Sequence, residues 1–160
     1  MIVKNLLIIQ ARMNSKRLPG KIMKNLGKYK VIELLIKRLR KSKEINKIIV
    51  ATTNKKHDDI LCEFLDKIKI NYFRGSEDNV LKRYKDAASK FKPEYIIRIT
   101  ADCPFIDAKI IDKMIKLYNL NKIDYLSNTN PPTFPDGLDV EIFSFKSLIK
   151  SYLNATSKHD

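Results

Sequence analysis

A group of cations directly follows the first apolar run of the chain. Residues 5–11 (NLLIIQA) are mostly apolar. The next ten residues hold four positive charges: Arg12, Lys16, Arg17 and Lys21. Arginine can grip phosphate oxygens through two parallel hydrogen bonds, while lysine supplies a compact point charge and Ser15 adds a hydroxyl donor. Residues of these types predict a phosphate-binding loop, and a solvated basic turn is the alternative.

Glycine contributes little to this loop. Neither of the glycine-rich phosphate signatures, GxxxxGK[ST] and GxGxxG, occurs in it. Gly20 is the only glycine in its core. Anion binding would therefore depend on side chains more than on backbone amides.

Carboxylates form a second group of candidates. Asp102 follows the apolar run 94–101, and Pro104 forces the chain to turn there because proline cannot donate to a strand ladder. A carboxylate facing a phosphate loop repels the ligand unless a cation lies between them, and Mg²⁺ takes oxygen ligands from carboxylates and phosphates. Asp102 is therefore a candidate Mg²⁺ ligand, or else an aspartate that hydrogen-bonds its own turn.

A third acidic group lies in PDGLDVEIF, residues 135–143, where Asp136, Asp139 and Glu141 surround a Gly turn. Asp139 and Glu141 are two residues apart, so a strand over 139–145 would place them on one face. One of them is expected to supply a second metal carboxylate or to bind a sugar hydroxyl. A plain exposed hairpin is the alternative.

The elements that must position these side chains alternate along the chain. Short β-branched runs predict strands over 5–11, 45–53, 68–73, 94–101, 123–128 and 139–145. Apolar residues at helical spacing predict helices over 31–42, 57–68, 77–91, 107–120 and 145–154, with Asp107 as the cap of the fourth. Such alternation predicts an α/β fold with a mostly parallel sheet covered on both faces. Ligands in such sheets bind beyond the carboxyl ends of the strands, which are here the loops 11–21, 74–79 and 101–107.

The bulk composition is that of one globular domain. The 160 residues are 44% hydrophobic and 31% charged, which suits a single domain over 1–160 with a real core. No apolar run approaches the length of a membrane span, and the N-terminus lacks the layout of a signal peptide. A cytoplasmic location without membrane partners is expected.

The net charge of +14 invites a nucleic-acid interpretation. The lysines are spread almost evenly over the chain, however, which favours a solvated basic surface. Cys62 and Cys103 are too few and too distant to predict disulfides or a zinc site, so each is expected to be a buried thiol. His57 and His159 likewise lack neighbours at metal-ligand spacing.

The loops together resemble a known family. QARMNSKRLPGK, residues 10–21, is similar to the N-terminal nucleotide signature of the cytidylyltransferases that activate acidic sugars, the CMP-Kdo and CMP-acylneuraminate synthetase superfamily. The resemblance is closest to the branch of spore coat polysaccharide biosynthesis protein F. Its signature A-R-x-x-S-x-R-L-P-G-K is matched by Ala11, Arg12, Ser15, Arg17, Leu18, Pro19, Gly20 and Lys21. Three further stretches resemble motifs of that branch in the same order: RGSEDNVLKRY (74–84), RITADCPFID (98–107) and PDGLDVEIFSF (135–145).

The resemblance implies a nucleotide-diphospho-sugar transferase fold, which is a three-layer αβα sandwich with a Rossmann-like sheet. The implied reaction is CTP plus an acidic sugar giving CMP-sugar and pyrophosphate. Its implied catalytic residues are Arg12, Lys21 and Asp102, of which Asp102 would hold Mg²⁺ with Asp139 as a second metal carboxylate. The implied nucleotide site consists of Ala11, Arg12, Ser15, Arg17, Lys21, Gly75 and Asn79. The segment Gly75–Asn79 would lie along the cytosine, with Asn79 as a base contact because its amide both donates and accepts.

The resemblance also bears on length and assembly. Relatives continue well past the equivalent of Asp160, and the additional part completes their sugar site and dimer contact. The chain is therefore expected to be a truncated form in which nucleotide binding survives better than turnover, and a homodimer is expected for the longer proteins. The rival hypotheses are a same-fold glycosyltransferase or transferase for a non-sugar acceptor, and a non-catalytic basic protein that binds nucleic acid. The latter predicts a contiguous cationic face with aromatic residues for stacking.

Overall fold

The computed structural model describes residues 3–15 and 17–156 of the chain. Within these residues the centre is a six-stranded sheet with the order β5-β4-β1-β6-β8-β7. Its strands are β1 (Asn5–Gln10), β4 (Lys47–Thr53), β5 (Tyr72–Gly75), β6 (Tyr95–Thr100), β7 (Tyr125–Ser127) and β8 (Glu141–Ser144). β1, β4, β5 and β6 pair in parallel, whereas β8 runs antiparallel to both β6 and β7. The mostly parallel sheet expected from the sequence is thus confirmed.

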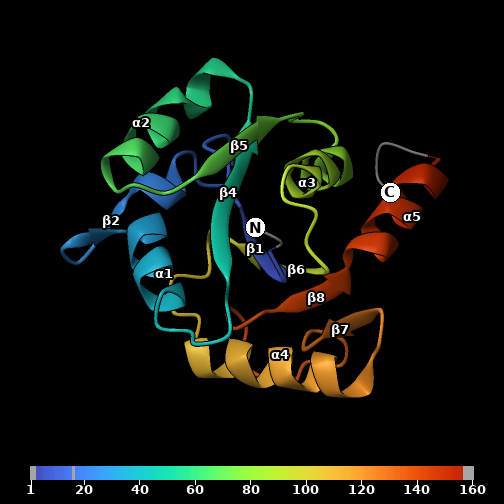
Figure 1. The fold of residues 1–160 in the computed structure, drawn as a ribbon. Helices are drawn as coiled ribbons and strands as arrows, with labels where there is room; N and C mark the ends of the chain where they lie inside the picture. Colours follow the sequence, from blue (N-terminus) through green and yellow to red (C-terminus); the bar gives the residue numbers. More distant parts are fainter. Residues whose placement is uncertain (1–2, 16, 157–160) are drawn as a thin grey trace.

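Helices cover both faces of this sheet (Figure 1). One face packs against α1 (Val31–Leu39), α2 (Asp59–Lys67) and α4 (Ala108–Asn121), and the other against α3 (Val80–Ser89) and α5 (Phe145–Asn154). The shorter elements are the 3₁₀ turns η1 (Lys21–Met23) and η2 (Lys56–Asp58) and the hairpin of β2 (Asn25–Leu26) with β3 (Tyr29–Lys30). The result is the α/β architecture in three layers that the sequence predicted.

Strand β1 shows why the sheet forms the core. Leu7 and Ile9 join the apolar cluster under α1, α2 and α4, while Leu6 and Ile8 join the cluster under α3 and α5. Successive side chains of a strand point to opposite faces, so a strand covered on both sides must be apolar throughout. Burial of each such side chain contributes roughly 1.5–3 kcal/mol.

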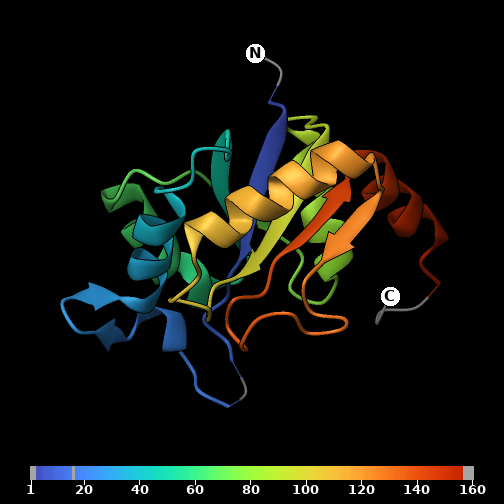
Figure 2. The ribbon, with the colours of Figure 1, turned by 90° about the horizontal axis from the view of Figure 1, so that it is seen from below.

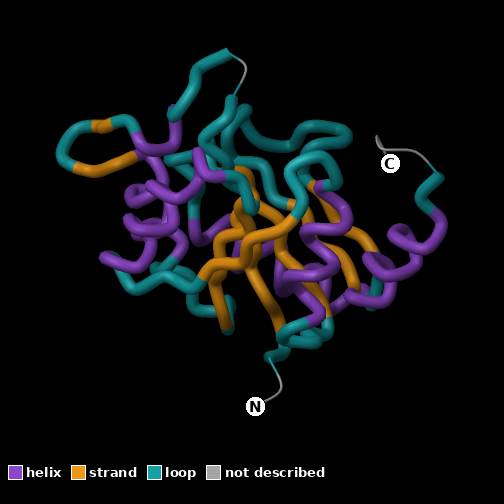
Figure 3. Tube along the Cα trace, turned by 90° about the horizontal axis from the view of Figure 1, so that it is seen from above, coloured by secondary structure: helices purple, strands orange, loops and turns teal. Residues whose placement is uncertain are grey.

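The carboxyl ends of the parallel strands lie together at one end of the molecule. The loops after β1 and β6 and the segment 128–140 before β8 lie at this end, opposite the N-terminus (Figure 2). Figure 3 shows loops gathered at the same end. The backbone pairing continues to this edge, because the N–H of Ala11 donates to Ala51 O at 3.2 Å and the N–H of Ala101 donates to Gln10 O at 3.0 Å. Loops that are distant in sequence therefore become neighbours.

Two strand predictions need correction. β5 begins at Tyr72 rather than at residue 68, because residues 68–70 complete the end of α2: Lys69 has a positive φ of 55°, and the Ile70 N–H donates to Leu65 O at 2.9 Å. β8 begins at Glu141, so Asp139 lies in the segment before the strand and not within it.

One predicted helix cap is confirmed, and one short hairpin was not predicted. Asp107 does cap α4, since its Oδ1 accepts from the Lys109 N–H at 2.8 Å. The β2–β3 hairpin was not predicted, because its strands are too short to carry a periodic pattern. Within the described ranges, no helix is both long and apolar enough to cross a membrane.

Candidate active site

Most of the candidates from the first loop lie around one cavity. This cavity has a volume of about 310 Å³ and opens beyond the carboxyl ends of β1 and β6. Its lining includes Gln10, Ala11, Arg12, Ser15, Arg17, Lys21, Ile22, Thr100, Ala101 and Asp102. Gly75, Asn79 and Asp139 are not part of this lining. The strand order explains the convergence, since it places β1 directly beside β6.

Lys21 and Asp102 form an ion pair at this cavity. Nζ of Lys21 contacts Oδ2 of Asp102, and both side chains are partly exposed. Burial by itself raises the pKa of Asp102, but hydrogen bonds from Lys21 and Thr100 outweigh it and hold the pKa below its ordinary value of 3.8. Asp102 is thus an anion at neutral pH, and it holds one of the cations expected to meet a phosphate.

Met13 closes the cationic loop at its base. Its N–H donates to Oδ1 of Asp58 at 2.7 Å, and its carbonyl accepts from the N–H groups of Gly20 at 2.8 Å and Ser15 at 3.0 Å. Gly20 has a φ of 68°, a backbone conformation in which a side chain would be strained. Arg12 therefore directly precedes a turn whose base is fixed by Met13.

Asp58 anchors this turn from the inside. It is fully buried at the end of η2. Oδ2 accepts from the hydroxyls of Thr52, at 2.9 Å, and Thr53, and from the Thr53 N–H at 3.0 Å, while Oδ1 accepts from Met13. Burial by itself raises the pKa of Asp58, but the bonds from Thr53, Met13 and Thr52 outweigh it and lower the pKa below 3.8. Hydrogen bonds to a charged group contribute about 1.5–3 kcal/mol each, so the ionised carboxylate fixes the cationic loop to β4.

The segment Gly75–Asn79 follows β5 and is held by a buried arginine. Arg83, in α3, is 0% exposed, and its Nη1 donates to the Ser76 carbonyl. Nε and Nη2 of Arg83 have no hydrogen-bond partner among the described residues. A Cβ on Gly75 would lie 2.8 Å from Cε1 of Phe73 and 3.0 Å from Cγ of Arg83, so any other residue there would force one of these side chains to shift. The aliphatic part of Arg83 thus packs close to Gly75 while its guanidinium holds the Ser76 carbonyl.

Asn79 begins α3 as its N-cap. Its Oδ1 accepts from the Lys82 N–H at 2.6 Å, and its own N–H donates to Ser76 Oγ at 3.0 Å. The amide oxygen thus caps the helix, and no residue in the described part of the chain accepts a hydrogen bond from the Nδ2 group. The contact of Asn79 with a base stays a prediction, in which the Nδ2 group is the donor and Oδ1 has one lone pair already in use.

Glu77 and His57 connect the two loops. Oε1 of Glu77 lies 3.4 Å from Nε2 of His57 and 3.5 Å from Nδ2 of Asn14. Nε2 of His57 also lies 3.8 Å from Oδ1 of Asp58. His57 therefore lies between the anchor of the first loop and the acidic side chain of the second, although the sequence suggested no role for it.

Asp139 lies in the segment before β8 with other carboxylates near it. Burial, and then repulsion by Asp136, Glu141 and Asp102, raise the pKa of Asp139 above its ordinary value. A divalent cation would relieve such repulsion, and carboxylate oxygens are the donor type that Mg²⁺ takes. Among the described residues, no group of three or more His, Cys, Asp or Glu could hold a metal ion. Phosphate oxygens would therefore have to complete the coordination.

Among the described residues, the remaining candidates from the sequence do not line the cavity beyond β1 and β6. Lys16 and His159 lie outside the described residues. Cys62 and Cys103 are buried free thiols, as predicted, and burial raises the pKa of both thiols above the ordinary value. Both are therefore protonated at neutral pH and are poor nucleophiles.

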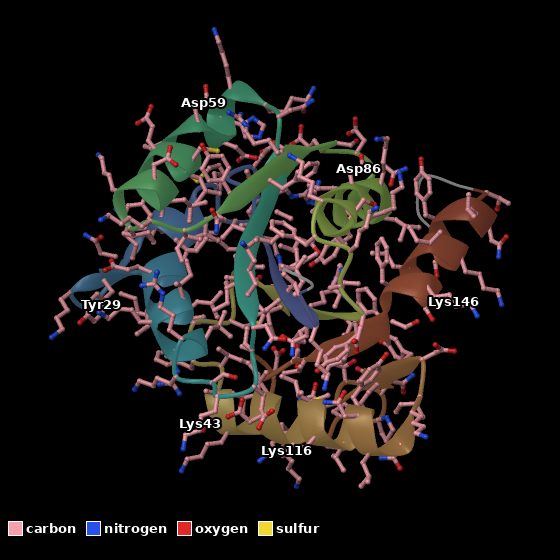
Figure 4. The ribbon with its side chains drawn as sticks, in the orientation of Figure 1. Tyr29, Lys43, Asp59, Asp86, Lys116 and Lys146 are labelled. Carbon is pink, nitrogen blue, oxygen red and sulfur yellow. The ribbon has the colours of Figure 1, made fainter. Side chains whose placement is uncertain are left out.

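A further group of cations lies on another part of the surface. A cavity of about 810 Å³ is lined by six cations: Arg38, Lys41, Lys43, Lys109, Lys113 and Lys116. Two of them, Lys43 and Lys116, point outward from the fold (Figure 4). The described residues that line this cavity include no aromatic side chain, whereas binding of single-stranded nucleic acid depends on aromatic stacking. This arrangement favours a solvated basic surface.

Asp58 and Arg83 were not predicted as residues of the site. A signal for Asp58 exists in TTNKKHDD, residues 52–59, because the loop after β4 also follows the carboxyl end of a parallel strand. The rule that selected the other three loops therefore applies to it as well. Arg83 gives no comparable signal, since the sequence does not distinguish a buried helical arginine from the many exposed cations.

A mostly parallel α/β sheet with a cationic loop at its carboxyl edge is the architecture of nucleotide-binding α/β proteins. A family model described as cytidylyltransferase matches residues 6–158. The chain belongs to the cytidylyltransferase family. The spore coat polysaccharide biosynthesis protein SpsF of Bacillus subtilis is 40% identical over 131 residues, which are 79% of this chain and 55% of that protein. The branch suggested by the motifs is thus confirmed.

Solved structures agree with this assignment. A cytidylyltransferase from Leptospira borgpetersenii serovar Hardjo-bovis is 39% identical with a TM-score of 0.92, covering 98% of this chain and 66% of that one. A CMP:2-keto-3-deoxy-manno-octonic acid synthetase complexed with CTP is 14% identical with a TM-score of 0.77, covering 96% of this chain and 79% of that one. Because the second structure is only 14% identical in sequence, it shows a shared fold and nothing more. The chain spans little more than half of the length of the curated relatives it matches.

Proposed function

We propose that the chain transfers CMP from CTP to an acidic sugar and releases pyrophosphate, as a step in surface polysaccharide or glycan synthesis. The observation that carries the proposal is the convergence of Arg12, Lys21 and Asp102 on one cavity beyond β1 and β6. Membership of the cytidylyltransferase family supports CTP as the nucleotide. The name of the Bacillus relative supports polysaccharide synthesis as the context.

The proposed reaction is an in-line displacement at the α-phosphorus. A hydroxyl oxygen of the acceptor forms a bond to the α-phosphorus, and its proton leaves to solvent. The bond from the α-phosphorus to the bridging oxygen breaks, and pyrophosphate departs with the electron pair. The protein forms no covalent bond in this reaction, so its contribution is positioning and stabilisation of charge.

The cationic loop supplies that stabilisation. Arg12 and Lys21 would neutralise the triphosphate and the charge that grows on the leaving pyrophosphate, with Ser15 and Arg17 as further phosphate contacts and Ala11 in the same wall. Lys21 is paired with Asp102 in the free protein. A triphosphate would compete for the Lys21 ammonium and free the Asp102 carboxylate. Because this ion pair is partly exposed, the exchange costs little.

Mg²⁺ is the proposed cofactor, with Asp102 and Asp139 as its protein ligands. When bound, Mg²⁺ neutralises phosphate charge during the transfer. Burial is the largest cause of the raised pKa of Asp139, followed by repulsion from Asp136, Glu141 and Asp102, and a cation placed near Asp102 and Asp139 would relieve the repulsive part.

Cytosine is proposed to lie along Gly75–Asn79. The Nδ2 group of Asn79 would donate to an acceptor atom on the cytosine ring, because its Oδ1 already caps α3. Arg83 would keep the segment in place through the Ser76 carbonyl. A homodimer of the longer proteins and a cytoplasmic location stay predictions.

Calorimetric titration with CTP, UTP, ATP and GTP, each with and without Mg²⁺, tests the proposal. We expect CTP to bind at least tenfold more tightly than the other three, and Mg²⁺ to strengthen its binding. Equal weak binding of all four nucleotides that moderate salt abolishes would indicate nonspecific attraction to the basic surface and would overturn the proposal.

A further inference from the structure

A second cavity, of about 410 Å³, lies on the side of the sheet that α3 and α5 cover. The two helices lie side by side there (Figure 1). Its walls combine the apolar side chains of Val80, Phe143 and Leu148 with the polar side chains of Tyr84, Arg98 and Glu141. An apolar wall with a few convergent polar groups is typical of sites for small molecules.

The Tyr84 hydroxyl is an unsatisfied polar group in this wall. Tyr84 is 3% exposed, and no described residue forms a hydrogen bond of good geometry with its hydroxyl, although the guanidinium of Arg98 lies within reach of it. Burial raises the pKa of Tyr84 well above its ordinary value. The neighbouring guanidinium of Arg98 opposes this rise in part, through its charge and through a side-chain contact that lacks the geometry of a full hydrogen bond. A buried hydroxyl without a partner costs about 1–3 kcal/mol. A ligand that accepts from it or donates to it would remove that cost.

Arg98 places a positive charge in the same cavity. Its Nη1 donates to Oε2 of Glu141, its direct neighbour across the β6–β8 pair, and the Tyr125 hydroxyl donates to Oε1 of Glu141 at 2.7 Å. The guanidinium has five N–H donors, so these contacts leave donors for an anionic ligand. The side chain of Arg98 is partly exposed and can be reached.

This second cavity adjoins the nucleotide cavity. Gln10 lines the nucleotide cavity, and its Oε1 lies 3.4 Å from Nη2 of Arg98. Thr100, which also lines the nucleotide cavity, is two residues beyond Arg98 on β6. Side chains two residues apart share one face of a strand and lie roughly 7 Å apart along it. A molecule of the size of a sugar that is bound at Arg98 therefore reaches the nucleotide cavity.

We propose that this second cavity is the acceptor subsite and that it selects a sugar carboxylic acid. The inference rests on the proposed function. The carboxylate of the acceptor pairs with Arg98, one of its hydroxyls satisfies Tyr84, and its C–H face packs on Phe143. Glu141 accepts from a further hydroxyl of the sugar. A neutral sugar of the same size lacks the charge for Arg98 and binds more weakly.

Titration of the chain with two sugar acids, Kdo and N-acetylneuraminate, and two neutral sugars, mannose and N-acetylmannosamine, tests the inference. Each sugar is titrated without nucleotide and with α,β-methylene-CTP, which blocks transfer. We expect the native chain to bind at least one acid about tenfold more tightly than the neutral sugars. In Tyr84→Phe the affinity for that acid falls about tenfold, the affinity for the CTP analogue stays within twofold, and the melting temperature does not fall, since an unsatisfied hydroxyl has been removed.

Tyr118→Phe is the matched control, because Tyr118 is a buried tyrosine of α4 on the opposite face of the sheet. It should leave binding of the acid unchanged. Arg98→Gln is a second variant, in which preference for the acid over the neutral sugars should disappear. Equal binding of the acid to native chain and Tyr84→Phe, or no binding of either acid by a chain that binds the CTP analogue, would overturn the inference. Failure to bind the CTP analogue would count against the proposed function, whereas the titrations without nucleotide decide the acceptor subsite.

Discussion

Two aspartates serve the same cationic loop in opposite ways. Asp58 is fully buried, and both of its carboxylate oxygens accept hydrogen bonds on the inner side of the loop. Asp102 is exposed, and its ion-pair partner is the side chain of Lys21. The first aspartate holds the backbone of the loop at Met13, and the second faces the side chains that would meet the phosphates.

The difference in burial separates a residue that positions the loop, Asp58, from a residue proposed to take part in the reaction, Asp102. A buried carboxylate cannot lose a partner without leaving a polar group unsatisfied, which costs about 1–3 kcal/mol. An exposed ion pair contributes only about 0–1 kcal/mol, so its members can exchange partners when a ligand arrives. Asp58 should therefore control stability and nucleotide affinity, while Asp102 should control turnover.

The largest expected effect is that of Asp102→Asn on turnover. Loss of the charge removes a proposed Mg²⁺ ligand, so kcat should fall by about 100-fold or more, and Mg²⁺ should no longer strengthen CTP binding. The free energy of unfolding should change by less than about 1 kcal/mol, since the ion pair is partly exposed. Steady-state kinetics and chemical denaturation measure the two quantities. If Mg²⁺ still strengthens CTP binding in this variant, Asp102 is not a metal ligand.

Asp58→Asn should produce the reverse pattern. An amide can accept from Thr52 and Thr53 through its oxygen, but its NH₂ group then faces the N–H of Met13, and two donors repel each other. We expect a loss of about 2 kcal/mol of stability and roughly a tenfold higher KM for CTP, with kcat changed less than KM. Glu63→Gln, an exposed carboxylate-to-amide change on α2, is the control and should leave both quantities unchanged. A fall in kcat alone, at native stability, would contradict the positioning role.

Asn79, in the loop after β5, allows a test with a smaller expected effect, because its amide oxygen caps a helix while its amide nitrogen is proposed to contact the base. Asn79→Asp keeps an oxygen for the cap of α3 but replaces the free donor, whereas Asn79→Ala removes both. We expect the melting temperature to fall only in the alanine variant, by the equivalent of about 1 kcal/mol. The affinity for CTP should fall roughly fivefold or more in both. Native affinity for CTP in Asn79→Asp would show that Nδ2 does not contact the base.

The smallest effect concerns pH. The pKa of Asp58 lies below its ordinary value of 3.8 in the folded chain, so the folded state favours the ionised form. Its contribution to stability is complete above the unfolded pKa and is lost as the pH falls through the folded pKa. The stability difference between the native chain and Asp58→Asn should therefore shrink below about pH 4, by on the order of 1 kcal/mol. Urea denaturation between pH 3 and pH 7 would measure it, and a difference that stays constant over this range would rule out titration of Asp58 as its source.

Much of the fold could be predicted because its signals are local. The apolar run of β1, the helical spacing in α1 to α5 and the Asp107 cap each depend on neighbouring residues, and the structure confirms them. The start of β5 was predicted too early, because the backbone N–H groups of residues 68–70 form hydrogen bonds with the end of α2. Arg12, Ser15 and Lys21 could be selected because they are close in sequence, and Asp102 because it follows a strand.

The sequence by itself determined the alternation of strands and helices, the family and the cationic loop, since each depends on patterns among residues that are close in sequence. Only the tertiary structure decided which charges meet. Lys21 pairs with Asp102 because strand order places β1 beside β6, and Asp58 reaches Met13 because β4 lies on the other side of β1. Burial, which turns Asp58 and Arg83 into anchors while most lysines stay solvated, depends on packing between distant segments. That packing is a property of the folded chain, because contacts between remote residues arise only when the whole sheet is assembled.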